Sequence, residues 1–228
     1  MPPTRFLSSP HTVRVAAWGG AIALAVATFV MVTRAMLAAQ GETTVDQAIL
    51  LWMAGHRTPS LTGVMVGLTT FGSRTLLIAL LLAAFAILIV LRDRWGLLHL
   101  AAACIGTWLL TSVTKGIIGR TRPTEVAHLV DVTGYSYPSG HSLATAALFL
   151  TIAIDVGRRL HTRAAKVALV AAACILVVMT GVSRVYLGVH YPSDVIGGFS
   201  LGTAWALLLA AATSVIAARR QQPHTRQP

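Results

Sequence analysis

The chain has 228 residues, of which 55% are hydrophobic and 11% charged, and its mean hydropathy is +0.73. Soluble domains carry about 25% charged residues, so the composition excludes an ordinary soluble enzyme and indicates one membrane-embedded domain over residues 1–228. A net charge of +11 then indicates basic loops that face anionic lipid headgroups and no nucleic-acid partner, since no basic surface with interleaved aromatic residues is present.

Five charge-free stretches are long enough to cross a bilayer as helices, because each has about 17–24 residues and a span needs ~20. They are residues 15–33, 75–91, 95–114, 167–183 and 195–218. A sixth stretch, 142–154, reaches that length if its helix begins near Gly140 and continues to Gly157. The first stretch, residues 15–33, is too long for the apolar core of a signal peptide and precedes no small-residue cleavage site, so we expect it to be retained as a membrane anchor. The sequence therefore predicts an all-α integral membrane protein with six transmembrane helices.

Residues 40–72 form a different kind of segment between the first two spans. Charged residues and a proline interrupt apolar patches that are each too short to span. We expect a short interfacial segment of one or two amphipathic helices, with Trp52 near the headgroups. A short re-entrant element is the alternative.

The distribution of cations predicts the orientation. Six spans place both termini on one side, together with eleven lysines and arginines, against seven on the other side. Three of those seven, Lys115, Arg122 and Arg184, belong to the motifs described next. The positive-inside rule therefore predicts cytoplasmic termini, with residues 219–228 as a disordered basic tail.

Three short blocks at the ends of apolar stretches carry the polar chemistry, and all three fall on the predicted outer side. The first runs from Lys115 to Arg122-Pro123, the second is Pro138-Ser139-Gly140-His141, and the third contains Arg184, His190 and Asp194.

His190 and Asp194 are one turn apart if the last helix begins here, as Pro192 suggests. A carboxylate at this spacing can fix one imidazole nitrogen and leave the other free to act. Taken alone, the pair could equally be a helix-start aspartate near a surface histidine.

Ser139 is a good helix N-cap and Gly140 permits close backbone approach to a ligand. The helix start favours an anion, beside which His141 can transfer a proton. Lys115 and Arg122 share a helix face if the third span continues to Pro123, and arginine guanidinium groups match phosphate oxygens. Each feature alone is also explained by ordinary capping or by helix-end cations.

Together the blocks resemble the signature of the type 2 phosphatidic acid phosphatase (lipid phosphate phosphatase) family. That signature is Lys, six residues, Arg-Pro; then Pro-Ser-Gly-His; then Ser-Arg, five residues, His, three residues, Asp. Every defining position is present, and the resemblance covers about residues 95–205. It implies a hydrolase that needs no metal or other cofactor.

The resemblance also implies a role for each residue. His190 is expected to attack phosphorus and form a phosphohistidine, Asp194 to orient it, and His141 to act as general acid and then base. The expected phosphate-binding residues are Lys115, Arg122, Ser139, Gly140 and Arg184.

The expected partner is a lipid phosphate at the outer face of a bacterial inner membrane. Polyprenyl diphosphate such as undecaprenyl diphosphate is the first choice, with phosphatidylglycerol phosphate and phosphatidate as the others. A phosphotransferase that passes the phosphate to a lipid or sugar acceptor is the alternative activity. The related vanadium-dependent haloperoxidases are soluble, which argues against that chemistry here. The oligomeric state is not predicted.

Overall fold

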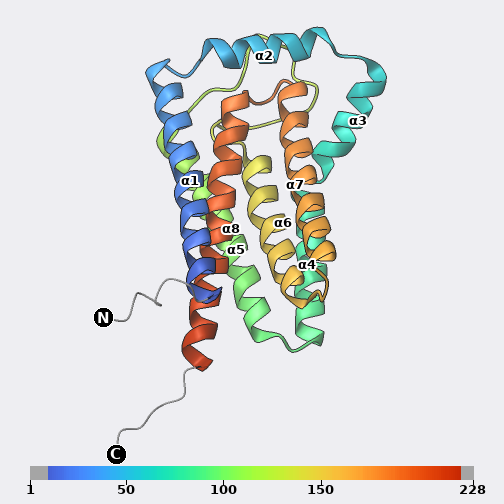
Figure 1. Ribbon diagram of the computed structural model, residues 1–228. Helices are drawn as coiled ribbons and strands as arrows, with labels where there is room; N and C mark the ends of the chain where they lie inside the picture. Colours follow the sequence, from blue (N-terminus) through green and yellow to red (C-terminus); the bar gives the residue numbers. More distant parts are fainter. Residues whose placement is uncertain (1–9, 222–228) are drawn as a thin grey trace, which may run out of the picture.

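The computed structural model describes residues 10–221, with the side chains of 16–73 and 75–215, and this part of the chain is helical without strands (Figure 1). Its helices are α1 (Pro10–Ala38), α2 (Thr44–Gly55), α3 (Pro59–Thr70), α4 (Arg74–Val90), α5 (Arg94–Ile118), α6 (Gly140–Arg159), α7 (Arg163–Tyr186) and α8 (Pro192–Gln221).

Six segments of the described chain are long and apolar enough to cross a membrane, which confirms the six-span bundle. They are Ala16–Ala38, Pro59–Val90, Arg94–Ile118, Gly140–Arg159, Arg163–Tyr186 and Pro192–Val215. The short stretch 142–154 lengthens as expected, because the helix begins at Gly140 and ends at Arg159. At the other end of the chain, α8 extends through Gln221, three residues into the tail predicted to be disordered; residues 222–228 lie outside the described part.

The segment 40–72 contains two helices, but only the first has the expected position. Helix α2 crosses the end of the bundle (Figure 1), whereas α3 packs against α7 and forms the first half of the 32-residue span Pro59–Val90. An interfacial or re-entrant position is therefore wrong for α3. Residues 71–73 break this span, and Ser73 caps α4 by accepting a hydrogen bond from the Leu76 N–H. That break divides one apolar crossing into two short patches.

Helices α6 and α8 form the centre of the bundle. Helix α8 packs against both α1 and α6, and α6 packs in turn against α5 and α7. Gly198 and Gly202, one turn apart on α8, lie against the backbone of α6. Small residues at this spacing let transmembrane helices approach closely. The two helix starts that carry the second and third motif blocks are therefore held together by backbone-to-backbone packing.

Two connections complete the end of the bundle that carries α2. The connection of residues 119–139 returns over this end without helix or strand, and the turn between α7 and α8 contains Gly188 with a φ of +79°. A side chain at Gly188 would lie 2.8 Å from the carbonyl oxygen of Ala127, so the turn requires glycine. Helix α1 starts and α8 ends at the opposite end of the bundle (Figure 1).

Candidate active site

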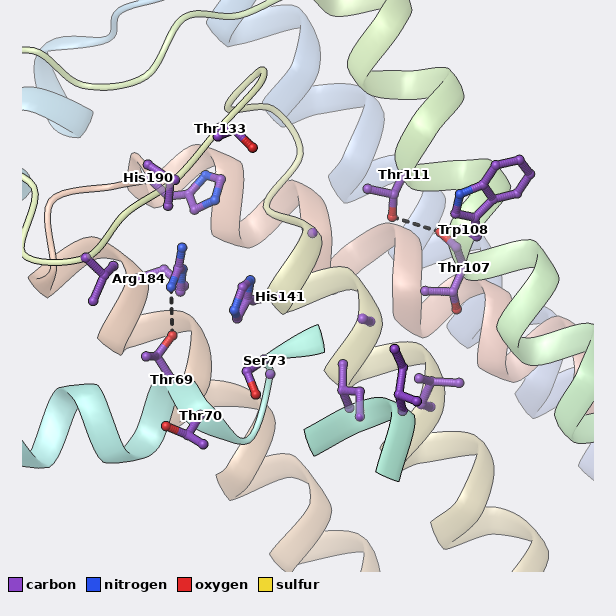
Figure 2. Close-up of a pocket in the computed structure, with 18 of the residues that line it drawn as sticks. Thr69, Thr70, Ser73, Thr107, Trp108, Thr111, Thr133, His141, Arg184 and His190 are labelled. Atoms are coloured by element: carbon purple, nitrogen blue, oxygen red, sulfur yellow. Dashed lines mark hydrogen bonds between the residues drawn. The ribbon is translucent and has the colours of Figure 1, made fainter. Parts of the chain in front are cut away.

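A cavity of about 860 Å³ lies at the end of the bundle that carries α2 and changes in character along its length. Figure 2 shows His141, Arg184 and His190 gathered at one end of it, where Lys115 and Arg122 also line the wall. Away from this end the wall becomes apolar, and α4, α5 and α6 supply it: Leu77, Ile78, Leu81, Cys104, Trp108, Ala144 and Leu148. The cavity thus joins a strongly basic site to an apolar space between membrane-spanning helices.

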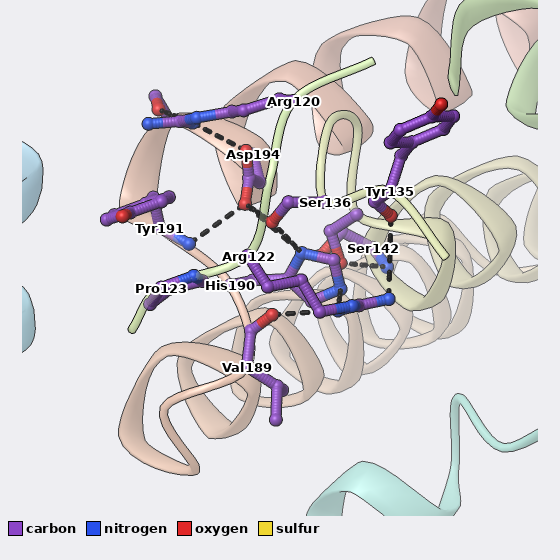
Figure 3. A network of polar contacts seen from close by, with 12 residues as sticks. Arg120, Arg122, Pro123, Tyr135, Ser136, Ser142, Val189, His190, Tyr191 and Asp194 are labelled. Carbon is purple, nitrogen blue, oxygen red and sulfur yellow. Dashed lines mark hydrogen bonds and ion pairs between the residues drawn. The ribbon is translucent and has the colours of Figure 1, made fainter. Parts of the chain in front are cut away.

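His190 and Asp194 form the pair expected from their spacing. His190 Nδ1 lies 3.2 Å from Asp194 Oδ2, and the same carboxylate oxygen accepts hydrogen bonds from the Tyr191 N–H at 2.9 Å and from the Ser136 hydroxyl (Figure 3). A carboxylate at Nδ1 favours the tautomer with its proton there. His190 Nε2 then carries the lone pair, 3.2 Å from Arg122 Nη1.

The imidazole of His190 is neutral at physiological pH. Burial lowers its pKa to about 4, and the cations Arg122 and Arg184 act in the same direction, which outweighs the opposite effect of Asp194. A neutral imidazole whose Nε2 carries no proton is the form required of a nucleophile.

The second block places Gly140 and His141 at the cavity but not Ser139. Gly140 and His141 both line the wall. Ser139 is fully buried, and its hydroxyl caps α6 by accepting from the Ser142 N–H at 3.4 Å and the Ser142 hydroxyl at 3.0 Å. Its predicted N-cap role is confirmed. Its hydroxyl does not lie with the other phosphate-binding candidates, because the capping hydrogen bonds direct it toward the first turn of α6.

The predicted helix-face relation of Lys115 and Arg122 is wrong. Helix α5 ends at Ile118, where Gly119 takes a left-handed conformation with a φ of +63°, so Arg122 lies in the 119–139 connection. The connection nevertheless brings Arg122 back to the cavity wall, which Lys115 also lines. The Lys115 ammonium donates to the carbonyl oxygens of Tyr135 and Ser136.

Backbone oxygens and a hydroxyl hold the two arginines. Arg122 donates to the carbonyl oxygens of Thr133 and Gly134, both at 3.0 Å, and of Val189 at 2.8 Å. Burial lowers the pKa of Arg122. Arg184 Nη1 donates to the Thr69 hydroxyl at 2.8 Å. These cations face the cavity with polar but neutral neighbours, an arrangement suited to a phosphoryl group.

Sequence reasoning missed several residues that hold this arrangement. Thr69 carries no motif signal, because its role depends on how α3 packs. Ser136 is a single hydroxyl in a long connection. Arg120 lies inside the first block without being a defining position of the signature, yet it is 5% exposed and donates to Asp194 Oδ1 at 2.6 Å. Its place between Lys115 and Arg122 was the available signal.

Comparisons with known proteins identify the family of this chain. The family model of the PAP2 superfamily matches residues 96–216. Phosphatidylglycerophosphatase B of Bacillus subtilis (strain 168) is 36% identical over 178 residues, which cover 76% of this chain and 86% of the relative. Undecaprenyl-diphosphatase of Sulfolobus acidocaldarius is 30% identical over 156 residues, 66% of this chain and 69% of the relative.

A solved structure extends the agreement to three dimensions. The crystal structure of a transmembrane PAP2 type phosphatidylglycerolphosphate phosphatase from Bacillus subtilis superposes with a TM-score of 0.76 and 32% sequence identity, covering 89% of this chain and 98% of that chain. With the family match over more than half of the sequence, these similarities show that the chain belongs to the PAP2 superfamily, the type 2 phosphatidic acid phosphatases.

Proposed function

We propose that this membrane-embedded lipid phosphatase cleaves the terminal phosphate of a lipid through a phosphohistidine formed on His190. The observation that carries the proposal is the cavity, whose basic end contains two imidazoles and whose other end is apolar. A phosphorylated headgroup matches the first part and a hydrocarbon chain the second.

The proposed reaction has two displacements. In the first, His190 Nε2 bonds to phosphorus as the bond from phosphorus to the lipid oxygen breaks, and His141 gives that oxygen a proton. Asp194 stabilises the positive charge that develops on the phosphorylated imidazole. In the second, His141 takes a proton from water, the water oxygen bonds to phosphorus, and the bond to His190 breaks to release inorganic phosphate.

Lys115, Arg122 and Arg184 are proposed to bind the phosphoryl oxygens and to stabilise the charge of both transition states. Gly140 contributes by letting the backbone at the start of α6 approach the phosphate. The role of Ser139 is proposed to be indirect, through the cap that fixes this helix start.

A His190→Ala variant tests the proposal. It should release no inorganic phosphate from any member of a panel of phosphatidylglycerophosphate, undecaprenyl diphosphate and phosphatidate, while remaining folded in detergent. Brief incubation of the wild-type protein with labelled substrate and denaturation at alkaline pH should trap an acid-labile phosphoprotein, absent from the variant. Undiminished phosphate release by His190→Ala would overturn the assignment.

The same panel ranks the substrates. Relatives named for phosphatidylglycerophosphate and for undecaprenyl diphosphate make these two the first to compare by kcat/KM. Adding a lipid or sugar alcohol at high concentration separates hydrolysis from phosphate transfer, because transfer would lower the yield of inorganic phosphate.

We also propose that the site opens to the outer side of a bacterial inner membrane, with cytoplasmic termini. At the opposite end of the bundle, the short connections and helix ends are strongly basic, as the positive-inside rule requires of a cytoplasmic face: Arg92, Arg94, Arg158, Arg159, Arg163 and Lys166. A fluorescent protein fused to the C-terminus should fluoresce in cells, and alkaline phosphatase fused there should be inactive. The reverse pattern would overturn this orientation.

A further inference from the structure

Two buried charged residues that are not defining positions of the three-block signature lie behind Asp194, the carboxylate that faces the candidate nucleophile. Arg120, in the 119–139 connection, is 5% exposed and Asp46, in the first turn of α2, is 2% exposed. Arg120 Nη1 donates to Asp194 Oδ1 at 2.6 Å, and Arg120 Nη2 donates to Asp46 Oδ2 at 2.8 Å. One guanidinium therefore joins two carboxylates from opposite ends of the sequence.

The contacts of Asp194 are divided between its two oxygens. Oδ1 accepts from Arg120, while Oδ2 faces His190 and also accepts from Ser136 and the Tyr191 N–H. Figure 3 shows Arg120 and His190 on opposite sides of this carboxylate. Because Arg120 holds one oxygen, the carboxylate plane is fixed with the other oxygen toward the imidazole.

Arg120 is itself held in place on several sides. Its guanidinium lies 4.1 Å from the centre of the Tyr191 ring and donates to the Ser193 hydroxyl at 2.7 Å. Asp46 accepts from the Ser193 N–H at 2.8 Å and from its hydroxyl at 2.6 Å, so it also caps the first turn of α8. Asp46 thereby connects helix α2 to α8, the helix that carries Asp194.

Arg120 does not lie in the cavity wall, and both of its terminal nitrogens are bonded to protein oxygens. A role in holding phosphate is therefore excluded for it by geometry. What it does supply is positive charge beside Asp194, which is fully buried. A buried carboxylate without a cation is strongly disfavoured and takes up a proton instead, and a protonated Asp194 could not stabilise a cationic, phosphorylated imidazole.

We propose that Arg120 and Asp46 are positioning residues that keep Asp194 ionised and aligned on His190, so that the surface helix α2 is part of the machinery of phosphate transfer. The inference rests on the proposed function, in which His190 is the nucleophile.

Variants that change the buried charge distinguish this positioning role from a role in packing alone. In Arg120→Gln, the buried carboxylates of Asp46 and Asp194 lose their shared cation and disfavour each other's ionised form. We expect kcat for phosphate release to fall about 100-fold, with KM changed by less than about threefold, because the phosphate-binding cations are untouched. Asp46→Asn alone should lower kcat only a few-fold, roughly the loss of one supporting ion pair.

The double variant is decisive. Removing the Asp46 charge from Arg120→Gln leaves Asp194 as the only buried carboxylate of the group, so the double variant should recover about tenfold in kcat over Arg120→Gln. Arg57 gives a matched control, since it lies at the same end of the bundle but donates to the carbonyl oxygens of Tyr186 and Ala127. Asp46→Asn should not rescue Arg57→Gln.

Arg120→Lys keeps the charge without the forked geometry and should retain at least tenfold more activity than Arg120→Gln. It also serves if Arg120→Gln does not fold, because wild-type kcat in folded Arg120→Lys/Asp46→Asn would overturn the positioning role. The positioning role would also be overturned by additive losses of kcat in Arg120→Gln/Asp46→Asn, or by wild-type kcat in folded Arg120→Gln. His190→Ala separates the two proposals: if it is inactive while Arg120→Gln is fully active, only the positioning role fails.

Discussion

Replacing Gly198 by alanine tests whether the close packing of α6 on α8 sets the geometry of the active site. A Cβ atom at residue 198 would lie 2.7 Å from the carbonyl oxygen of Ser139, 2.9 Å from the Cβ of Ser142 and 3.1 Å from the nitrogen of Leu143. Carbon atoms pack at about 3.5–4.0 Å. The first turn of α6 must therefore move away from α8 by roughly 0.6–1 Å.

The effect on stability and the effect on activity should differ. Overpacking destabilises by about 1–3 kcal/mol, and alanine offsets about 1 kcal/mol of this because it is a better helix former than glycine. The net loss of unfolding free energy is thus at most about 2 kcal/mol. The moving turn carries His141, however, while His190 precedes α8, and a displacement of 1 Å between reacting groups lowers rates about 100-fold.

Phosphate release and thermal unfolding of the detergent-purified variants measure the two effects separately. Gly157→Ala, near the other end of α6, is the matched control because no atom lies within 4 Å of its added methyl group. We expect Gly198→Ala to lose far more kcat than stability and Gly157→Ala to keep wild-type kcat. Wild-type kcat in a folded Gly198→Ala variant would refute the reasoning.

Three further predictions address the nucleophile, a phosphate-binding cation and the apolar cavity. The pKa of His190 is about 4 in the folded protein and about 6.5 in an unfolded chain, so the unfolded state binds more protons between these two pH values. The free energy of unfolding should therefore fall as the pH decreases from 6.5 to 4. Chemical denaturation of His190→Gln should show a smaller fall over the same range. Thr69→Val removes the hydroxyl that accepts from Arg184 and should lower kcat about 10-fold or more, whereas Thr70→Val, whose hydroxyl bonds only within its own helix among the described contacts, should not. Leu81→Trp fills the apolar part of the cavity and should lower kcat/KM for long-chain lipid phosphates at least tenfold more than for short-chain analogues; equal losses would contradict a hydrocarbon-binding role.

Hydropathy predicts the number of spans because each crossing must bury its backbone polar groups in a helix and its side chains in lipid. It does not predict the form of the second crossing. Gly72 and Ser73 interrupt it, and Ser73 caps α4 by a hydrogen bond that a hydropathy average cannot detect. The apolar residues of α3 were therefore assigned to the interface, although that helix packs against α7 and supplies Thr69 to the site.

In the site, too, local spacing predicts some contacts, whereas contacts that depend on tertiary packing could not be predicted. Motif spacing predicts His190 and Asp194 as a pair, and the two side chains do lie 3.2 Å apart. His190 precedes the first residue of α8, Pro192, so the contact is made across the helix start and not within one helical turn. The approach of Arg122 was predicted for the wrong reason, since α5 ends before it. Burial of Arg120 could not be predicted from spacing, because it depends on Asp46, which lies 74 residues away in the chain.

The neighbours of each cation separate those that can bind phosphate from the one that cannot. Among the described contacts, Lys115 and Arg122 donate to backbone carbonyl oxygens and Arg184 to a hydroxyl, so their positive charge is not neutralised by the protein. Among the lysines and arginines whose side chains the structure describes at this end of the bundle, Arg120 alone pairs with carboxylates, and it pairs with two. An anionic substrate gains most from cations whose charge is unpaired before it binds, because no ion pair must be broken. The sequence places these cations in or just beyond the last turns of two apolar helices, and only their partners distinguish the phosphate-binding group from the residue that supports Asp194.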